Sequence, residues 1–106
     1  MDKEKTAIYC RIDSCGSEEV AEQAIQIQRF KLEHYTKNKN LHVAGYYEDI
    51  GYPGNDLNRP GLQKLLSDYH NGKFKFVLVI NVDRLFRGLS RKKEIFPFHI
   101  KSLIRW

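Results

Sequence analysis

The hydrophobic and polar positions of the chain divide it into alternating strands and helices. Three short apolar runs, at residues 5–12, 41–48 and 74–80, have the length and the β-branched or aromatic content of strands. The last run is continuously apolar, which is typical of a strand covered on both faces. Between the runs, residues 17–37 and 60–71 repeat apolar positions at helical spacing. This order predicts an α/β fold with a mostly parallel central sheet flanked by helices.

Both predicted helices have start or stop signals. Ser17 is a suitable N-cap, and the two glutamates after it complement the positive end of the helix dipole. Pro60 suits the first turn of the second helix, which Gly72 closes. Residues 51–61, between the second strand and this helix, are dense in turn-forming residues and predict a loop.

With 106 residues, the chain is long enough for one domain with a modest core. We expect this domain over residues 1–91, followed by an apolar tail at 92–106 that docks back onto it or contacts another chain. Cys10 and Cys15 are too few for a disulfide framework. The histidines lack metal-ligand spacing, so we expect no zinc site.

The net charge of +5 favours a polyanionic partner such as nucleic acid. No apolar run is long enough to span a bilayer, and no signal peptide is recognisable. We therefore expect a cytoplasmic protein with no membrane partner.

Polar side chains gather where the predicted strands end. Arg11 and Asp13 have the same parity in the first strand, so both leave the sheet on one side. Asp49 ends the second strand, and Asp83 and Arg84 follow the third. Ligands collect at the carboxyl ends of strands in open α/β sheets. Arginines that converge there suit a phosphodiester, because the guanidinium pairs bidentately with phosphate oxygens and stays charged.

Three further polar residues belong to this constellation. Arg59 and Arg87 lie in segments next to the strand ends. Gln28 falls inside the apolar stripe of the first helix when the residues are placed on a helical wheel. A glutamine within such a stripe needs a hydrogen-bond partner, and a site at the sheet edge would supply it.

Five segments in this order and spacing resemble the catalytic domain of serine recombinases, the resolvase/invertase family: AIYCRI, AIQIQ, YYEDIGYPG, NRPGLQKLL and VLVINVDRLFRG. The resemblance covers residues 6–91. It implies an α/β domain and cofactor-free, site-specific DNA breakage for recombination and integration of mobile elements. A serine attacks the scissile phosphate, which gives a 5′-phosphoserine link and a free 3′-hydroxyl, and four strands are exchanged in a tetramer.

The resemblance also implies which residues form the active site. Matched position by position, they are Arg11, Gln28, Arg59, Asp83, Arg84 and Arg87, with Asp49 as an acidic residue at the rim.

The nucleophile position departs from the family pattern. Where the family reads Tyr-x-Arg-Val-Ser, this chain has Asp13, and Ser14 follows it. One interpretation is a domain without catalysis, in which Asp13 forms an ion pair with an arginine. A second makes Ser14 the nucleophile through a bulge that re-aims it. A third makes Asp13 the phosphoryl acceptor, but water would discharge the acyl phosphate. Parity and chemistry favour the first over the second, and the second over the third.

Two functions of other classes remain open. In the family, a DNA-binding region follows the catalytic domain. We expect a short form without that region, and therefore weak or nonspecific DNA binding by this chain alone. It could then be a non-catalytic module that forms a homodimer or higher oligomer, or pairs with a full-length recombinase. Alternatively, Asp13, Asp49 and Asp83 could bind Mg²⁺ in a nuclease or phosphoacceptor domain. The intervening arginines disfavour a cation, so we expect no metal.

Overall fold

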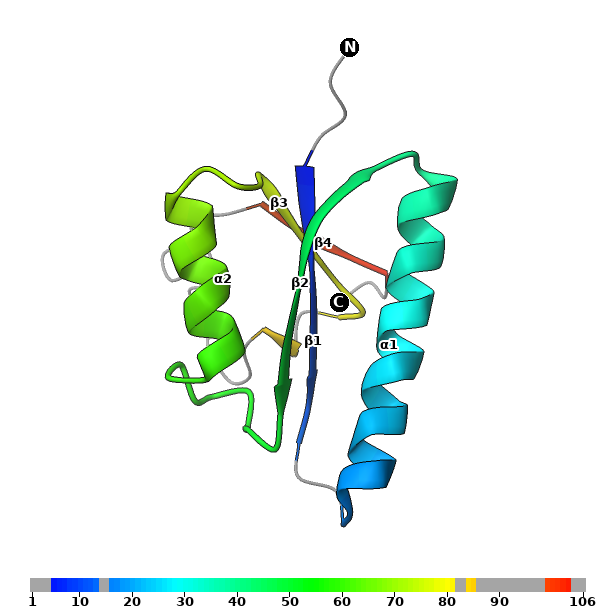
Figure 1. Cartoon of the computed structure of the whole chain (residues 1–106), viewed down its shortest axis with the longest axis vertical. Coiled ribbons are helices and arrows are strands. Elements are labelled where there is room, and N and C mark those ends of the chain that lie inside the picture. The colour runs from blue at the N-terminus through cyan, green and yellow to red at the C-terminus, as the bar shows by residue number, and fades with distance from the viewer. Residues whose placement is uncertain (1–4, 14–15, 82–83, 86–98, 104–106) are drawn as a thin grey trace.

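The computed structural model describes residues 5–13, 16–81, 84–85 and 99–103, which form a four-stranded parallel sheet with two helices (Figure 1). The strand order is β2-β1-β3-β4, and every neighbouring pair runs parallel. The elements in chain order are β1 (Lys5–Ile12), α1 (Glu18–Asn38), β2 (His42–Ile50), α2 (Pro60–His70), β3 (Phe76–Val79) and β4 (His99–Ser102). The predicted fold class is confirmed.

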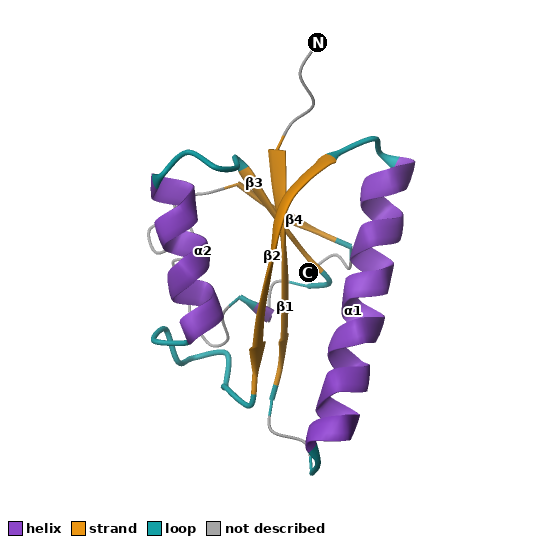
Figure 2. Ribbon diagram, viewed as in Figure 1, coloured by secondary structure: helices purple, strands orange, loops and turns teal. Residues whose placement is uncertain are grey.

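The two helices cover opposite faces of the sheet (Figure 2). On the α2 side, Ala7 and Tyr9 of β1 pack with Leu62 and Leu65 of the helix. On the α1 side, the alternate β1 residues pack against the apolar stripe of α1. The strand therefore has two buried faces, as its apolar composition requires. The face of Tyr9 is also the face of Arg11 and Asp13, so the predicted parity places these residues on the α2 side.

The first helix begins as predicted. Ser17 has extended backbone at the N-cap, and its hydroxyl accepts a hydrogen bond from Val20 N at 3.2 Å. Gln28 lies within the buried stripe with 7% of its surface exposed. The side-chain amide of Gln28 thus lies between α1 and the sheet, near the carboxyl end of β1.

The strands differ from the prediction mainly at the far edge of the sheet. β3 is shorter than its apolar run, and β4 was not among the three predicted strands. β4 lies in the segment expected to be a tail, and it pairs with β3 from Phe76↔His99 to Val79↔Ser102. This pairing makes β3 an interior strand, which explains why its run is apolar throughout.

The register of β1 leaves part of one edge of this strand open to other partners. β1 pairs with β2 from Lys5↔His42 to Ile12↔Ile50, but with β3 only from Thr6↔Phe76 to Ile8↔Leu78. The chain leaves β1 toward β2 and later crosses to β3 on its other side. Ligands bind beyond the carboxyl ends of strands where the connections diverge in this way. No helix in the described part of the chain is long and apolar enough to cross a membrane.

Candidate active site

Five of the eight predicted site residues lie within the described segments, and they gather at the carboxyl ends of β1 and β3: Arg11, Asp13, Gln28, Arg59 and Arg84. The other three, Ser14, Asp83 and Arg87, lie outside the described residues. The constellation thus comes from β1, α1, the start of α2 and the turn after β3.

Arg11 is the centre of the site and is fully buried. Its Nη1 donates to Asp13 Oδ1 and, at 2.8 Å, to the carbonyl of Tyr52. Its Nε donates to the carbonyl of Arg84 at 2.9 Å. One carboxylate and two carbonyls therefore compensate a cation that would be costly to bury alone.

Asp13 forms the ion pair with Arg11 that the non-catalytic interpretation expects. The Arg11 side chain is fully buried, whereas 46% of the Asp13 side chain is exposed. The carboxylate thus meets the guanidinium from the solvent side. A phosphate oxygen would make the same kind of charge-assisted hydrogen bond, so Asp13 competes with phosphate for Arg11.

Gln28 holds the main chain of Arg11. Its Oε1 accepts from Arg11 N at 3.3 Å, and its Nε2 donates to Arg11 O at 3.0 Å. Among the described residues, the pairing of β1 with β3 ends at Ile8, so at Arg11 the amide of Gln28 takes the place of a neighbouring strand. The partner that the buried glutamine requires is therefore the backbone of Arg11, and Gln28 acts as a positioning residue.

Arg59 lies at the N-cap position of α2 and is also fully buried. Its Nη1 donates to the carbonyl of Pro53 at 3.5 Å, and its Nη2 donates to the carbonyl of Leu85. The guanidinium carbon lies 5.7 Å from the ring centroid of Tyr9, which is a cation–π distance. Burial lowers the pKa of Arg59, and the positive charge of Arg11 acts in the same direction. Arg59 is therefore a buried residue held by main-chain carbonyls and an aromatic ring, and not a solvated surface arginine.

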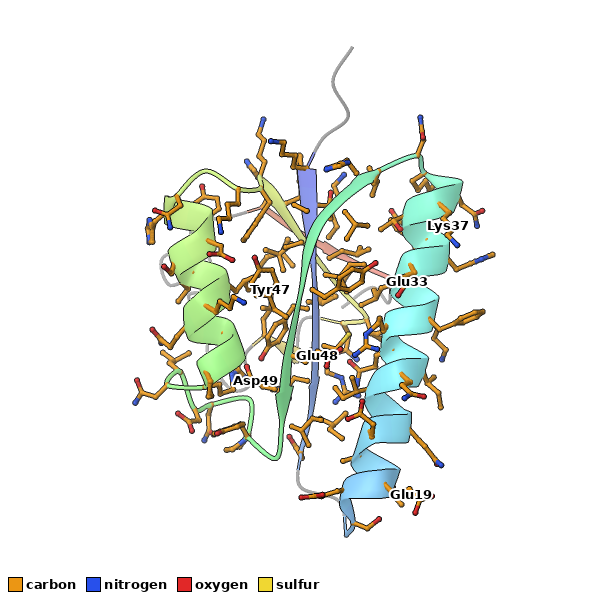
Figure 3. The ribbon with its side chains drawn as sticks, viewed as in Figure 1. Glu19, Glu33, Lys37, Tyr47, Glu48 and Asp49 are labelled. Carbon is orange, nitrogen blue, oxygen red and sulfur yellow. The ribbon has the colours of Figure 1, made fainter. Side chains whose placement is uncertain are left out.

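Asp49 fastens the start of α2 to the end of β2. Its Oδ1 accepts from Gly61 N at 2.7 Å, and its Oδ2 accepts from Leu62 N at 2.9 Å. These amides belong to the first turn of a helix, which has no intrahelical acceptor for them. Gly61 is required here, because a Cβ at this position would lie 2.4 Å from the carbonyl oxygen of Glu48. In Figure 3, Asp49 and Tyr47 lie on the α2 side of β2, and Glu48 lies on the α1 side.

Tyr9 is a site residue that the sequence reasoning missed. Its hydroxyl donates to Asp49 Oδ2 at 2.7 Å, while its ring lies beside Arg59. Burial raises the pKa of Tyr9, and the hydrogen bond to Asp49 adds to this rise, so the phenol stays protonated. The signal was its parity, because Tyr9 lies two residues before Arg11 on the same face of the strand.

Asp49, one of the three aspartates of the Mg²⁺ alternative, has its carboxylate engaged in hydrogen bonds, and Asp83, another of the three, lies outside the described residues. Both oxygens of Asp49 accept hydrogen bonds from α2 or Tyr9. Within the described segments, no three His, Cys, Asp or Glu side chains are grouped so that they could hold a metal ion. Asp49 acts here as a helix cap.

The parallel sheet with its two helices is similar in fold to solved catalytic domains of serine recombinases. The N-terminal catalytic domain of TP901-1 integrase superimposes with a TM-score of 0.79 at 33% identity, covering 94% of this chain and 78% of that one. The C-terminal catalytic domain of ISC1926 TnpA, an IS607-like serine recombinase, gives 0.80 at 27% identity, with 95% and 68% covered. A serine recombinase from Sulfolobus solfataricus gives 0.75 at 25% identity, with 98% and 71% covered.

A family model identifies the chain more closely. The model for the resolvase N-terminal domain matches residues 6–96, and the chain belongs to this family. Among curated proteins, no sequence gives a significant match. The resemblance noted from the five sequence segments is thus confirmed, and the chain has the catalytic-domain fold of a site-specific recombinase.

Proposed function

We propose that this chain is a recombinase catalytic domain that binds a DNA phosphodiester at the carboxyl edge of its sheet without breaking it. The observation that supports this function is the ion pair between Asp13 and Arg11. A carboxylate stands where the family carries its serine, and it occupies a guanidinium that a scissile phosphate would need. Family membership supports DNA as the substrate class, and the ion pair supports the absence of cleavage.

A carboxylate at residue 13 is poorly suited to strand exchange. If an oxygen of Asp13 attacked phosphorus, the bond from phosphorus to the 3′ oxygen would break, and Asp13 would carry an acyl phosphate. Water would hydrolyse this acyl phosphate and leave a broken strand. A phosphoserine is instead a stable ester that the 3′-hydroxyl can attack to reseal the DNA. The Asp13–Arg11 pair therefore fits a domain that leaves its DNA intact.

The charge of the chain supports contact with the DNA backbone. The net charge is +5. The proposed phosphate-binding groups are four guanidinium groups, those of Arg11, Arg59, Arg84 and Arg87, and Asp83 precedes Arg84 in the sequence. Contacts of this kind depend on salt and carry no sequence preference. Gln28 supports them indirectly, because it holds the main chain of Arg11.

The same proposal includes the partners of the domain. We expect it to act in the cytoplasm as a homodimer or higher oligomer, or beside a full-length recombinase of a mobile element. In either assembly, the domain contributes a DNA-binding surface of the recombinase fold and no strand cleavage.

A covalent-adduct assay tests whether the domain cleaves DNA. The full chain is incubated with a nicked duplex in EDTA, and protein joined to DNA is measured on a denaturing gel. We expect no adduct from the wild-type chain or from Asp13→Asn, and an adduct from Asp13→Ser that is lost when Arg11→Lys is added. A wild-type adduct that disappears in Ser14→Ala would contradict the proposal and identify Ser14 as the nucleophile. One that disappears in Asp13→Asn instead would identify Asp13 as the acceptor.

A binding assay tests the competition between Asp13 and phosphate. Fluorescence anisotropy with a short labelled duplex at low salt measures the affinity of each variant. Asp13→Asn should bind about two- to fivefold tighter than wild type, because an exposed partner is removed from Arg11. Asp56→Asn is the matched control, since Asp56 lies in the neighbouring loop and its Oδ1 accepts from Asn58 N. Equal gains in the two variants would mean that net charge alone explains the effect.

A further inference from the structure

Two buried arginines join the same two segments of the chain. Arg11 and Arg59 each donate one hydrogen bond to the loop 51–59 and another to the turn at 84–85. The four acceptors are two consecutive pairs of main-chain carbonyls: Tyr52, Pro53, Arg84 and Leu85. The loop and the turn are far apart in sequence, and these guanidinium groups tie them together.

Neither guanidinium is open to a ligand in this arrangement. Both arginines have 0% of their surface exposed. The loop and the turn accept hydrogen bonds from both guanidinium groups, and Asp13 also pairs with Arg11, so a DNA phosphate could not reach either group in this arrangement. Arg59 Nε is buried and has no hydrogen-bond partner among the described residues. A buried donor of a charged group without an acceptor is costly, which marks Arg59 as incompletely satisfied here.

We propose that the loop 51–59 and the turn at 84–85 form a latch over Arg11 and Arg59, and that a DNA phosphodiester opens it by replacing the carbonyls as acceptors. The inference rests on the proposed function, because it assigns these arginines to phosphate. It adds to that function a closed state, in which main-chain carbonyls hold the groups that bind DNA.

Each carbonyl that leaves a guanidinium group would be replaced by a phosphate oxygen as hydrogen-bond acceptor. Carbonyl oxygens are neutral, whereas the oxygens of a phosphodiester are charged and form stronger hydrogen bonds with a guanidinium. A phosphate would also offer an acceptor to Arg59 Nε. The released carbonyls would turn to water as the loop moves outward. No covalent bond changes in this step.

The movement has defined limits at both ends of the loop. Gly51 N donates to Ile12 O at 2.9 Å, and Asp49 holds the amide of Gly61 at 2.7 Å. Gly51 has a φ of +86°, a backbone conformation that favours glycine. Opening would therefore be confined to residues 52–59 and would leave the sheet and α2 in place.

Hydrogen–deuterium exchange of the full chain tests the latch. The probes are a short duplex DNA at low salt and, separately, inorganic pyrophosphate. We expect either probe to speed exchange in peptides covering 52–59 by about tenfold, while peptides in β1 and α1 keep their rates. Without any probe, Arg59→Lys should also speed exchange in this loop, because one ammonium group cannot bridge both carbonyls as the guanidinium does.

Arg29→Lys is the matched control. Arg29 forms an ion pair with Glu48 on the opposite face of the sheet, so its replacement should leave the loop rates unchanged. Circular dichroism establishes that each variant is folded. The effect of the probes on the wild-type chain tests the latch even if a variant fails to fold.

The outcomes separate the latch from the proposed function. Faster loop exchange with pyrophosphate but no binding of duplex would support a latch that phosphate groups open, and it would contradict both DNA as the ligand that opens it and the DNA-binding function. Duplex binding, shown by anisotropy, with unchanged or slower exchange at 52–59 would overturn the latch and leave the function standing. Loop rates in Arg59→Lys equal to those of wild type would also overturn it.

Discussion

Gln28 of α1 exchanges two hydrogen bonds with the main chain of Arg11 in β1, at 3.3 Å from the Arg11 amide and 3.0 Å to its carbonyl. A helix side chain thus supplies hydrogen bonds to β1 at a position past its described pairing with β3. Because Arg11 carries the central guanidinium of the site, this contact links the apolar face of α1 to the position of the proposed phosphate-binding group.

Replacing Gln28 should lower stability. Gln28→Ala removes both hydrogen bonds from a buried main chain, so we expect the free energy of unfolding to fall by about 2–3 kcal/mol. Urea unfolding followed by circular dichroism measures the change. Gln26→Ala is the control, since Gln26 is exposed on the same helix and its loss should cost less than about 0.5 kcal/mol. Similar losses in both variants would show that the main-chain contact contributes nothing.

The hydrogen bond from Tyr9 to Asp49 should appear as an energetic coupling. Tyr9→Phe and Asp49→Asn share one contact of 2.7 Å, so their destabilisations should deviate from additivity by about 1–2 kcal/mol in a double-mutant cycle. A second cycle pairs Tyr9→Phe with Asp68→Asn. Asp68 receives its hydrogen bond from Tyr47 instead, so this cycle should be additive within about 0.5 kcal/mol. Additivity in the first cycle would show that the Tyr9–Asp49 hydrogen bond contributes no coupling energy, and it would contradict the prediction.

The thiol of Cys10 should make stability sensitive to alkaline pH. Burial raises the pKa of Cys10 from 9.0 to about 12. Below pH 9, both folded and unfolded states keep the proton, and the contribution is fully present. Between about pH 9 and 12, only the unfolded state loses the proton, so stability falls as pH rises. Guanidinium chloride unfolding of wild type and Cys10→Ala across this range should give a flatter profile for the variant. Parallel profiles would contradict the prediction.

Asp68 should have the opposite effect on the acid side. The hydrogen bond from Tyr47 lowers the pKa of Asp68, and Lys73, with Nζ 3.4 Å from Asp68 Oδ1, lowers it further. The resulting stability is present above the ordinary value of 3.8 and is lost as pH falls through the lowered pKa in the folded state. Acid unfolding of Asp68→Asn should therefore show a shallower decline below about pH 4 than wild type does. An unchanged slope would mean that the carboxylate has the same pKa in both states.

The local pattern predicts most elements because each carries its own periodicity. The strand at residues 5–12 and the helix after Ser17 are marked by apolar spacing and a capping residue, and both appear as expected. β4 was missed because HIKS is short and gains its stability from pairing with β3, more than 20 residues earlier in the chain. Such a partner leaves no signal in the strand's own sequence.

The charged side chains of the site could be predicted from the sequence, but the main-chain groups that bind them could not. Parity predicts that Arg11 and Asp13 leave the sheet on one side, and the helical wheel predicts that Gln28 faces the sheet and needs a partner there. The contacts of these residues agree with both predictions. The carbonyls that hold Arg11 and Arg59 could not be anticipated, because every residue has a carbonyl and only the path of the loop decides where it points. The partner of Gln28 could not be predicted either, because it is the main chain of Arg11, which lies past the described β1–β3 pairing.

The bond between Asp49 and the amide of Gly61 closes residues 50–60 into a ring whose two ends meet regardless of what lies between them. Extra residues near the exposed Asn55 would then cost the domain little, because doubling the length of a closed loop adds only about 0.6 kcal/mol. The stability of the fold therefore depends little on the length of the loop that covers the arginines. Under the proposed function, changes in loop length should alter how readily DNA reaches this edge of the sheet without changing the sheet or α2.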